Sequence, residues 1–119
     1  MALSRLAREF AAEIANHDWS DAPYRADRAG HDRTKDHSTC EQLSLNETRV
    51  VRMNVMWVTA QVLGHADSNF DEYEFAEACG VNTKTRHGRQ DGGISAGVRK
   101  TPDGRYCRPG TWEPPEEQR

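Results

Sequence analysis

The residues best suited to chemistry lie between Thr83 and Arg105, where cationic and amide side chains follow one another closely. Lysine and arginine bind phosphate oxygens, arginine can also read guanine edges, and glutamine can pair with adenine. This chemistry is that of nucleic-acid recognition. The candidate DNA-binding residues are Thr83, Lys84, Thr85, Arg86, His87, Arg89, Gln90, Arg99, Lys100 and Arg105.

The charge is distributed unevenly along the chain. The 119 residues carry a formal net charge of −3. Residues 1–81 contain eight Lys/Arg and fourteen Asp/Glu, whereas residues 82–112 contain seven Lys/Arg and two Asp, a net charge of +5. A basic block in an otherwise acidic chain favours a phosphate-bearing partner. The alternative is a solvated charged face without a ligand.

The polar residues between 18 and 43 offer some zinc-ligand types, but their pattern supports a zinc site only weakly. His31, His37 and Cys40 offer three ligand atoms, yet their spacing fits no regular zinc knuckle and no fourth ligand is near. We therefore expect solvated side chains, with no metal and no cofactor.

Acidic residues and a histidine around the same region have the types found in nuclease active sites, but their spacing along the chain matches no nuclease motif. Its members would be His17, Asp18, Asp32 and Asp36. We expect no enzymatic activity.

The basic residues follow a helix-turn-helix pattern. Asn69 can cap a short acidic helix over 70–79, Gly80 supplies the turn, and Ala76 is the small residue where two helices cross. A second helix over roughly 83–96 would then enter the major groove. Its core-facing positions hold Thr, Gly and Arg, so this helix must pack through small residues or be short and bent.

A basic hairpin is expected after that helix. Thr101-Pro102-Asp103-Gly104 has the residues of a type I turn with a glycine bulge. The flanking segments 98–100 and 105–107 would form its two strands. Helix, turn, helix and β-wing is the order of a winged-helix DNA reader.

Upstream, two helices must position this region. Residues 3–16 form an amphipathic helix with one apolar face, and that face must pack on its own domain or on a second copy of the chain. Ser44 and Glu47 make a capping box that begins a nearly all-apolar helix over 45–63, with Gly64 as its stop. The expected apolar face is Leu3, Leu6, Phe10 and Ile14.

The domain organisation follows from these elements. We expect an N-terminal helix at 1–17, a polar connector at 18–43, a winged helix-turn-helix domain at 44–112 and a frayed tail at 113–119. The fold class is then α+β, mostly α, with no internal repeats. Three cysteines without a CxxC pair, no signal-peptide pattern and no membrane-spanning run favour the cytoplasm.

Residues 85–112 resemble small winged-helix proteins of actinobacteria and their phages, and the resemblance extends over about residues 70–112. Those proteins often carry an HG-polar-x-(S/D)-G-apolar-S stretch before a basic hairpin. The equivalent here is HGRQDGGIS, from His87 to Ser95, with one extra residue. The resemblance implies a winged helix-turn-helix fold and a regulatory or accessory role, without implying a target.

The sequence thus predicts binding to double-stranded DNA, as a transcriptional regulator or a phage or host accessory factor. A homodimer built on residues 3–16 would present two half-sites. The alternative is a protein-interaction module, an anti-host or assembly factor, that binds a protein through residues 1–43 and the acidic helix without contacting DNA.

Overall fold

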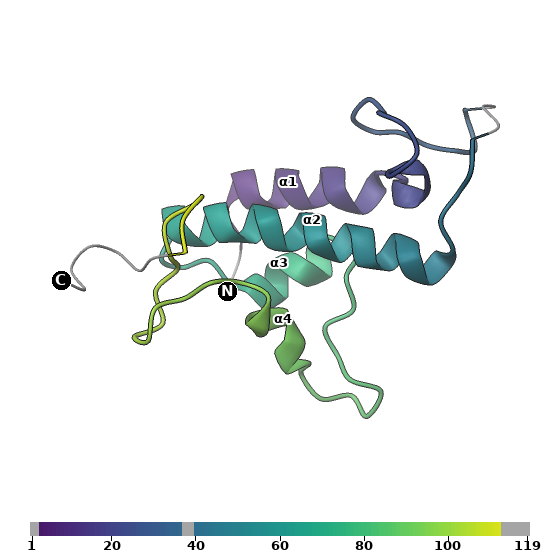
Figure 1. Ribbon diagram of the computed structural model, residues 1–119. Helices are drawn as coiled ribbons and strands as arrows, with labels where there is room; N and C mark the ends of the chain where they lie inside the picture. Colours follow the sequence, from purple (N-terminus) through teal and green to yellow (C-terminus); the bar gives the residue numbers. More distant parts are fainter. Residues whose placement is uncertain (1–2, 37–39, 113–119) are drawn as a thin grey trace.

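The structure is a computed structural model that describes residues 3–36 and 40–112. Within these ranges the chain forms helices joined by turns. The helices α1 and α2 lie side by side and run in opposite directions, α3 packs against both, and α4 follows below α3 (Figure 1). The helices are α1 (Arg5–Asn16), the short 3-10 helix η1 (Trp19–Asp21), α2 (Leu45–Ala66), α3 (Glu72–Ala78) and α4 (Gly92–Ala96).

The start of α2 is the capping box predicted from the sequence. The Ser44 hydroxyl accepts the Glu47 backbone N–H, and the Glu47 carboxylate accepts the Ser44 N–H. Two orphan donors are thereby satisfied. The expected stop at Gly64 is wrong, because α2 continues to Ala66. A Cβ at Gly64 would lie 2.4 Å from the Tyr106 ring, so this glycine allows close packing rather than ending the helix.

The acidic helix begins later than predicted. Its cap is Asp71, whose carboxylate accepts the backbone N–H groups of Tyr73 and Glu74. Asn69 instead donates its own N–H to the Asp67 side chain in the preceding turn. An aspartate at the positive end of a short helix also interacts favourably with the helix dipole.

Helix α1 packs through its alanines rather than through the whole predicted apolar face. Leu3 and Ile14 are buried, but Leu6 and Phe10 are 57% and 44% exposed. Small side chains on the covered face let α1 approach α2 and α3 closely. The alanines that replace the two exposed residues in the core are Ala7 and Ala11.

The predicted second helix over 83–96 is wrong. Only Gly92–Ala96 is helical, and the preceding residues form a tight loop. The Thr85 hydroxyl accepts the N–H groups of His87 and Arg89, and Gly88 has φ +82°. A threonine that satisfies nearby backbone donors and a left-handed glycine both favour a turn over a helix.

The predicted β-wing is also wrong, since no strand forms in the part of the chain that the structure describes. Lys100 and Tyr106 make a single bridge. The ladder cannot lengthen because the Arg99 N–H bonds the Gln61 side chain and Pro109 has no N–H to donate. The described chain is therefore a helical fold, not an α+β winged helix-turn-helix.

Candidate nucleic-acid interface

Residues 83–91, here called the basic loop, form a compact reverse turn. Lys84 and Gln90 make an antiparallel bridge. The Thr85 N–H donates to the Arg89 carbonyl at 2.7 Å, and the Gly88 N–H donates to the Thr85 carbonyl at 2.9 Å. These backbone bonds define the shape of the loop.

Both ends of the basic loop are fixed to the helices. The Thr83 hydroxyl donates to Glu77 on α3 at 2.7 Å, and Thr83 itself is buried. At the other end, the Asp91 carbonyl accepts the Tyr73 hydroxyl at 2.9 Å and its carboxylate caps α4. The tip between these anchors projects away from the helices (Figure 1).

The segment 99–107, here called the C-terminal turn, repeats this geometry. The Thr101 N–H donates to the Arg105 carbonyl at 2.7 Å, and the Gly104 N–H donates to the Thr101 carbonyl at 2.9 Å. Gly104 has φ +90°. The sequences KTRHGRQ (84–90) and KTPDGRY (100–106) share the pattern Lys-Thr-x-x-Gly-Arg. This short motif is confined to the two turns.

The cations of the basic loop are largely unpaired. Lys84 lies 3.6 Å from the exposed Glu77 carboxylate, a weak surface contact. Arg86, His87 and Arg89 are exposed, and within the described residues no carboxylate lies at ion-pairing distance from either arginine. Their positive charge is available to a partner.

The cations of the C-terminal turn are engaged internally. Lys100 pairs with Glu72 at 3.0 Å and lies over the Tyr106 ring. Arg105 pairs with Asp103 at 3.2 Å. Arg99 donates to the Thr111 carbonyl at 2.8 Å and stacks on the Trp112 ring. Of the ten predicted contact residues, seven thus gather in the basic loop, whereas the three in the C-terminal turn are occupied elsewhere.

Glu72 ties the C-terminal turn to α3 and is nearly buried. Burial opposes its charged form, but hydrogen bonds from Tyr106 and Lys100 outweigh that effect and hold the pKa of Glu72 below its usual range. The same burial and contact raise the pKa of the Tyr106 hydroxyl. The turn is therefore a structural element held by a buried carboxylate.

The polar connector contains a folded ion-pair network rather than an irregular segment. His31 Nε2 lies 2.9 Å from a carboxylate oxygen of the fully buried Asp21, and Arg33 binds the other oxygen. Arg25 Nε lies 2.6 Å from Asp27, whose carboxylate is 3.7 Å from His31 Nδ1. Charges buried in this way need such partners.

This network has the ligand types of a metal site but already holds cations of its own. Atoms of Asp21, Asp27 and His31 lie within 4.8 Å of one another. Guanidinium groups of Arg33 and Arg25 occupy the carboxylates that an ion would use. The arrangement is an ion-pair cluster that holds the turns of the connector together.

The zinc set considered from the sequence does not assemble in the described residues. His31 is committed to Asp21, and the Cys40 carbonyl accepts a hydrogen bond from Arg33 at 3.0 Å. His37 lies outside the described residues.

The acidic members of the nuclease-like set are each bonded within the connector. Asp18 caps η1 and accepts the Arg33 N–H at 3.0 Å. Asp32 accepts the Thr34 N–H, and Asp36 pairs with Arg25.

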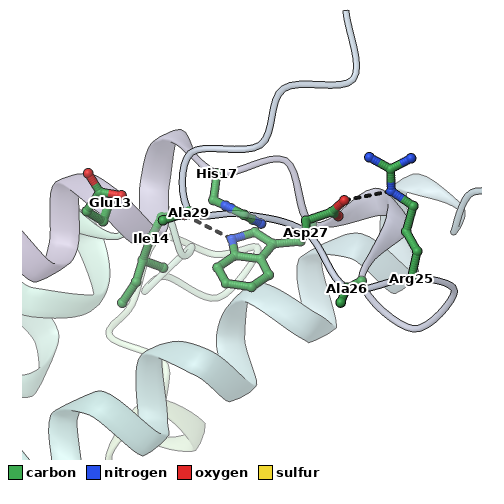
Figure 2. Close-up of a pocket in the computed structure, with 9 residues that line it drawn as sticks. Glu13, Ile14, His17, Arg25, Ala26, Asp27 and Ala29 are labelled. Atoms are coloured by element: carbon green, nitrogen blue, oxygen red, sulfur yellow. Dashed lines mark hydrogen bonds and ion pairs between the residues drawn. The ribbon is translucent and has the colours of Figure 1, made fainter. Parts of the chain in front are cut away.

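A hollow of about 380 Å³ lies between the end of α1 and the connector, and Figure 2 shows its lining. Trp19 forms part of the wall and donates its indole N–H to the Ile14 carbonyl at 2.9 Å. Arg25 and Asp27 are bonded to each other at the rim. Since these polar groups are already paired, they leave few to orient a ligand.

Comparison with protein-family models, curated proteins and solved structures finds no match for this chain. Among the described helices, none combines the length and apolar character needed to cross a bilayer.

Proposed function

We propose that the protein binds double-stranded DNA through the basic loop. The observation that carries the proposal is the exposed, unpaired state of Arg86 and Arg89 on a loop whose two ends are fixed to α3 and α4. A loop whose shape is fixed before binding loses less conformational entropy when it binds. Arginine forks bind phosphate oxygens and guanine edges.

The charge pattern supports the same partner. Glu77 is the acidic residue at the base of the loop, and its carboxylate is engaged by Thr83 and Lys84. These contacts hold the pKa of Glu77 below its usual range. The loop thus presents cations at its tip, while the Glu77 carboxylate at its base is already bonded.

Binding to a random-sequence duplex, followed by fluorescence anisotropy, tests this proposal. Contacts from Lys84, Arg86 and Arg89 would give a slope of log K against log salt of about −2.7, so affinity should fall roughly 40-fold between about 50 and 200 mM salt. An absence of binding at the lower salt would contradict the proposal.

The repeated turn offers a matched control for the loop. Arg89→Gln and Arg105→Gln change the same position of the two Lys-Thr-x-x-Gly-Arg segments. We expect Arg89→Gln to weaken duplex binding and to make the salt slope shallower by about one unit. Arg105→Gln should leave both unchanged, because Arg105 pairs with Asp103. Equal effects would assign the binding to general charge rather than to the loop.

A regulatory role requires sequence selectivity beyond phosphate contacts. Repeated selection from a random duplex pool should then enrich a common motif, and Arg86→Ala or His87→Ala should relax the preference. Recovery of unrelated sequences after selection would leave an accessory, non-specific DNA-binding role.

A second candidate function is self-association through α1. Leu6 and Phe10 lie four residues apart on one face of α1 and are 57% and 44% exposed. A second copy of the chain would cover them. The double variant Leu6→Gln and Phe10→Gln should then lower the mass measured by light scattering. A wild-type protein that stays monomeric at about 100 µM would exclude a dimer of micromolar Kd or tighter.

A further inference from the structure

A cleft of about 480 Å³ lies between α2 and the turn that follows α3, at the entrance to the basic loop. Its lining contains two guanidinium groups and no carboxylate. The lining residues are Arg49, Arg52, Met53, Gly80, Val81 and Asn82.

Neither arginine of this cleft has an acidic partner. Arg49 and Arg52 lie three residues apart on α2 and therefore share a face. Within the ranges 3–36 and 40–112, no carboxylate lies at ion-pairing distance from either side chain. Two adjacent cations without a counter-ion repel each other and favour an anion.

Arg52 also carries an unsatisfied donor. Its Nε atom is buried and has no hydrogen-bond partner among the described residues. Buried donors without an acceptor are uncommon in folded proteins, and each calls for an explanation such as an ion. The terminal nitrogens of a guanidinium bind anionic oxygens with charge-assisted hydrogen bonds.

The turn after α3 holds Arg52 in place. A Cβ at Gly80, which has φ +85°, would lie 3.8 Å from Arg52 Cδ, so the aliphatic stem passes close to the turn. Arg52 is also near enough to Cys79 to offset part of the burial that raises the pKa of the Cys79 thiol to about 12. The stem of Arg52 thus runs alongside the turn at Gly80.

Asn82 adds a polar group on the opposite wall. Its Oδ1 accepts the Lys84 N–H at 3.1 Å, which fixes the amide and leaves Nδ2 as a donor. The basic loop begins directly after Asn82 in the sequence.

We propose that this cleft binds a phosphate group through Arg49 and Arg52, with Asn82 as a third donor. The phosphate belongs either to the backbone of the duplex that the basic loop contacts or to a free phosphate ion or nucleotide. The first source rests on the proposed DNA-binding function, whereas the cleft itself stands on different residues.

Titration with inorganic phosphate tests the cleft without DNA. In ¹H–¹⁵N spectra at constant ionic strength, phosphate should shift the Arg52 Nε–H and Asn82 signals, and chloride should not. Arg49→Gln and Arg52→Gln should each weaken phosphate binding at least about tenfold, the loss of one charge-assisted contact. The exposed Arg28→Gln is the matched control and should bind as the wild type does. Should Arg52→Gln fail to fold, phosphate binding by Arg49→Gln, a change at an exposed position, still tests the proposal.

Duplex binding by the same variants distinguishes the two sources. Weaker DNA binding by Arg49→Gln, together with retained phosphate binding by an Arg86→Gln, Arg89→Gln variant, assigns the cleft to the nucleic-acid backbone. Phosphate binding with unchanged duplex affinity assigns it to a free phosphate or nucleotide. If phosphate leaves the Arg52 signal unmoved and the cleft variants bind duplex normally, the cleft proposal is overturned while the basic-loop proposal stands.

Discussion

Gln61 is the residue that joins the C-terminal turn to α2. Its side-chain NH₂ group donates to the Arg99 carbonyl at 3.0 Å and to the Cys107 carbonyl at 3.1 Å. Its Oε1 accepts the Arg99 N–H at 2.8 Å. The side chain is 5% exposed. One buried amide thus takes up backbone groups that a longer hairpin would have paired.

Gln61→Leu should lower the free energy of unfolding by about 2–3 kcal/mol, because it leaves buried backbone groups without partners. Urea denaturation followed by circular dichroism measures this loss. Asn54→Leu, at an exposed position of the same helix, is the control and should change stability by less than about 0.5 kcal/mol. Equal stability of the two variants would show that the Gln61 contacts contribute little.

Glu72 makes stability depend on pH. Because its pKa is lowered in the folded protein, the charged carboxylate stabilises the fold above the unfolded-state pKa, near 4.5. That contribution is lost as pH falls through the lower, folded-state pKa. Glu72→Gln should therefore be less stable than wild type at pH 7, and the difference should shrink by pH 3. Urea midpoints at both pH values test the sign, and a constant difference would contradict it.

At the scale of elements, α4 is short and is held against α2 by Trp57. The Trp57 indole N–H donates to the Ile94 carbonyl at 2.9 Å, and its ring lies against the backbone of Gly97. A Cβ at Gly97 would be 1.9 Å from that ring, whereas a Cβ at Gly92 meets nothing within 4 Å. Gly92, the first residue of α4, and Gly97, its C-cap, thus have different roles.

Gly97→Ala should destabilise the protein by about 1–3 kcal/mol, because Trp57 must move. Gly92→Ala should be neutral or stabilise it by up to about 1 kcal/mol, since alanine restricts the unfolded chain. Thermal unfolding of the two variants gives the comparison. A Gly97→Ala protein as stable as Gly92→Ala would mean that Trp57 does not pack on α4 as described.

Local signals in the sequence were sufficient where the chemistry is local. The Ser44 capping box and the turn at Gly80 are confirmed. The predicted helix over 83–96 is wrong because it followed the helix-turn-helix pattern, whereas Thr85 and Gly88 favour a turn.

Tertiary contacts explain the rest. Periodicity placed Leu6 in the α1 core face, but the covered face is chosen by how closely the alanines let the helices approach. Arg49 and Arg52 were unremarkable on α2, since nothing in their spacing shows that they border a cleft without carboxylates. The partners of Asp21 in the connector were equally hidden, because His31 and Arg33 meet it only after the chain turns back.

At the scale of the whole molecule, two copies of one turn serve different ends. The C-terminal turn has Pro102 and Asp103 at its tip and faces α2 and α3 through Gln61 and Glu72. The basic loop has Arg86 and His87 at the same positions, and the loop itself projects from the helices (Figure 1). The shared backbone shape lets the tips be exchanged without changing the scaffold.

The exchange of Arg86→Pro with His87→Asp should preserve the fold. Proline suits the second position of a type I turn, and exposed substitutions of this kind change stability by about 0.5 kcal/mol. Duplex affinity should nevertheless fall, because one cation is removed and one anion is added, and the salt slope should become shallower by about one unit.

The reciprocal double variant, Pro102→Arg with Asp103→His, adds positive charge to the C-terminal turn, which packs on α2 and α3 away from the basic loop. It should therefore not restore binding when the two double variants are combined. Anisotropy at several salt concentrations compares the three variants. Restored affinity in the combined variant would mean that net charge alone governs binding, whereas its continued loss would assign binding to the position of the basic loop on the helical body.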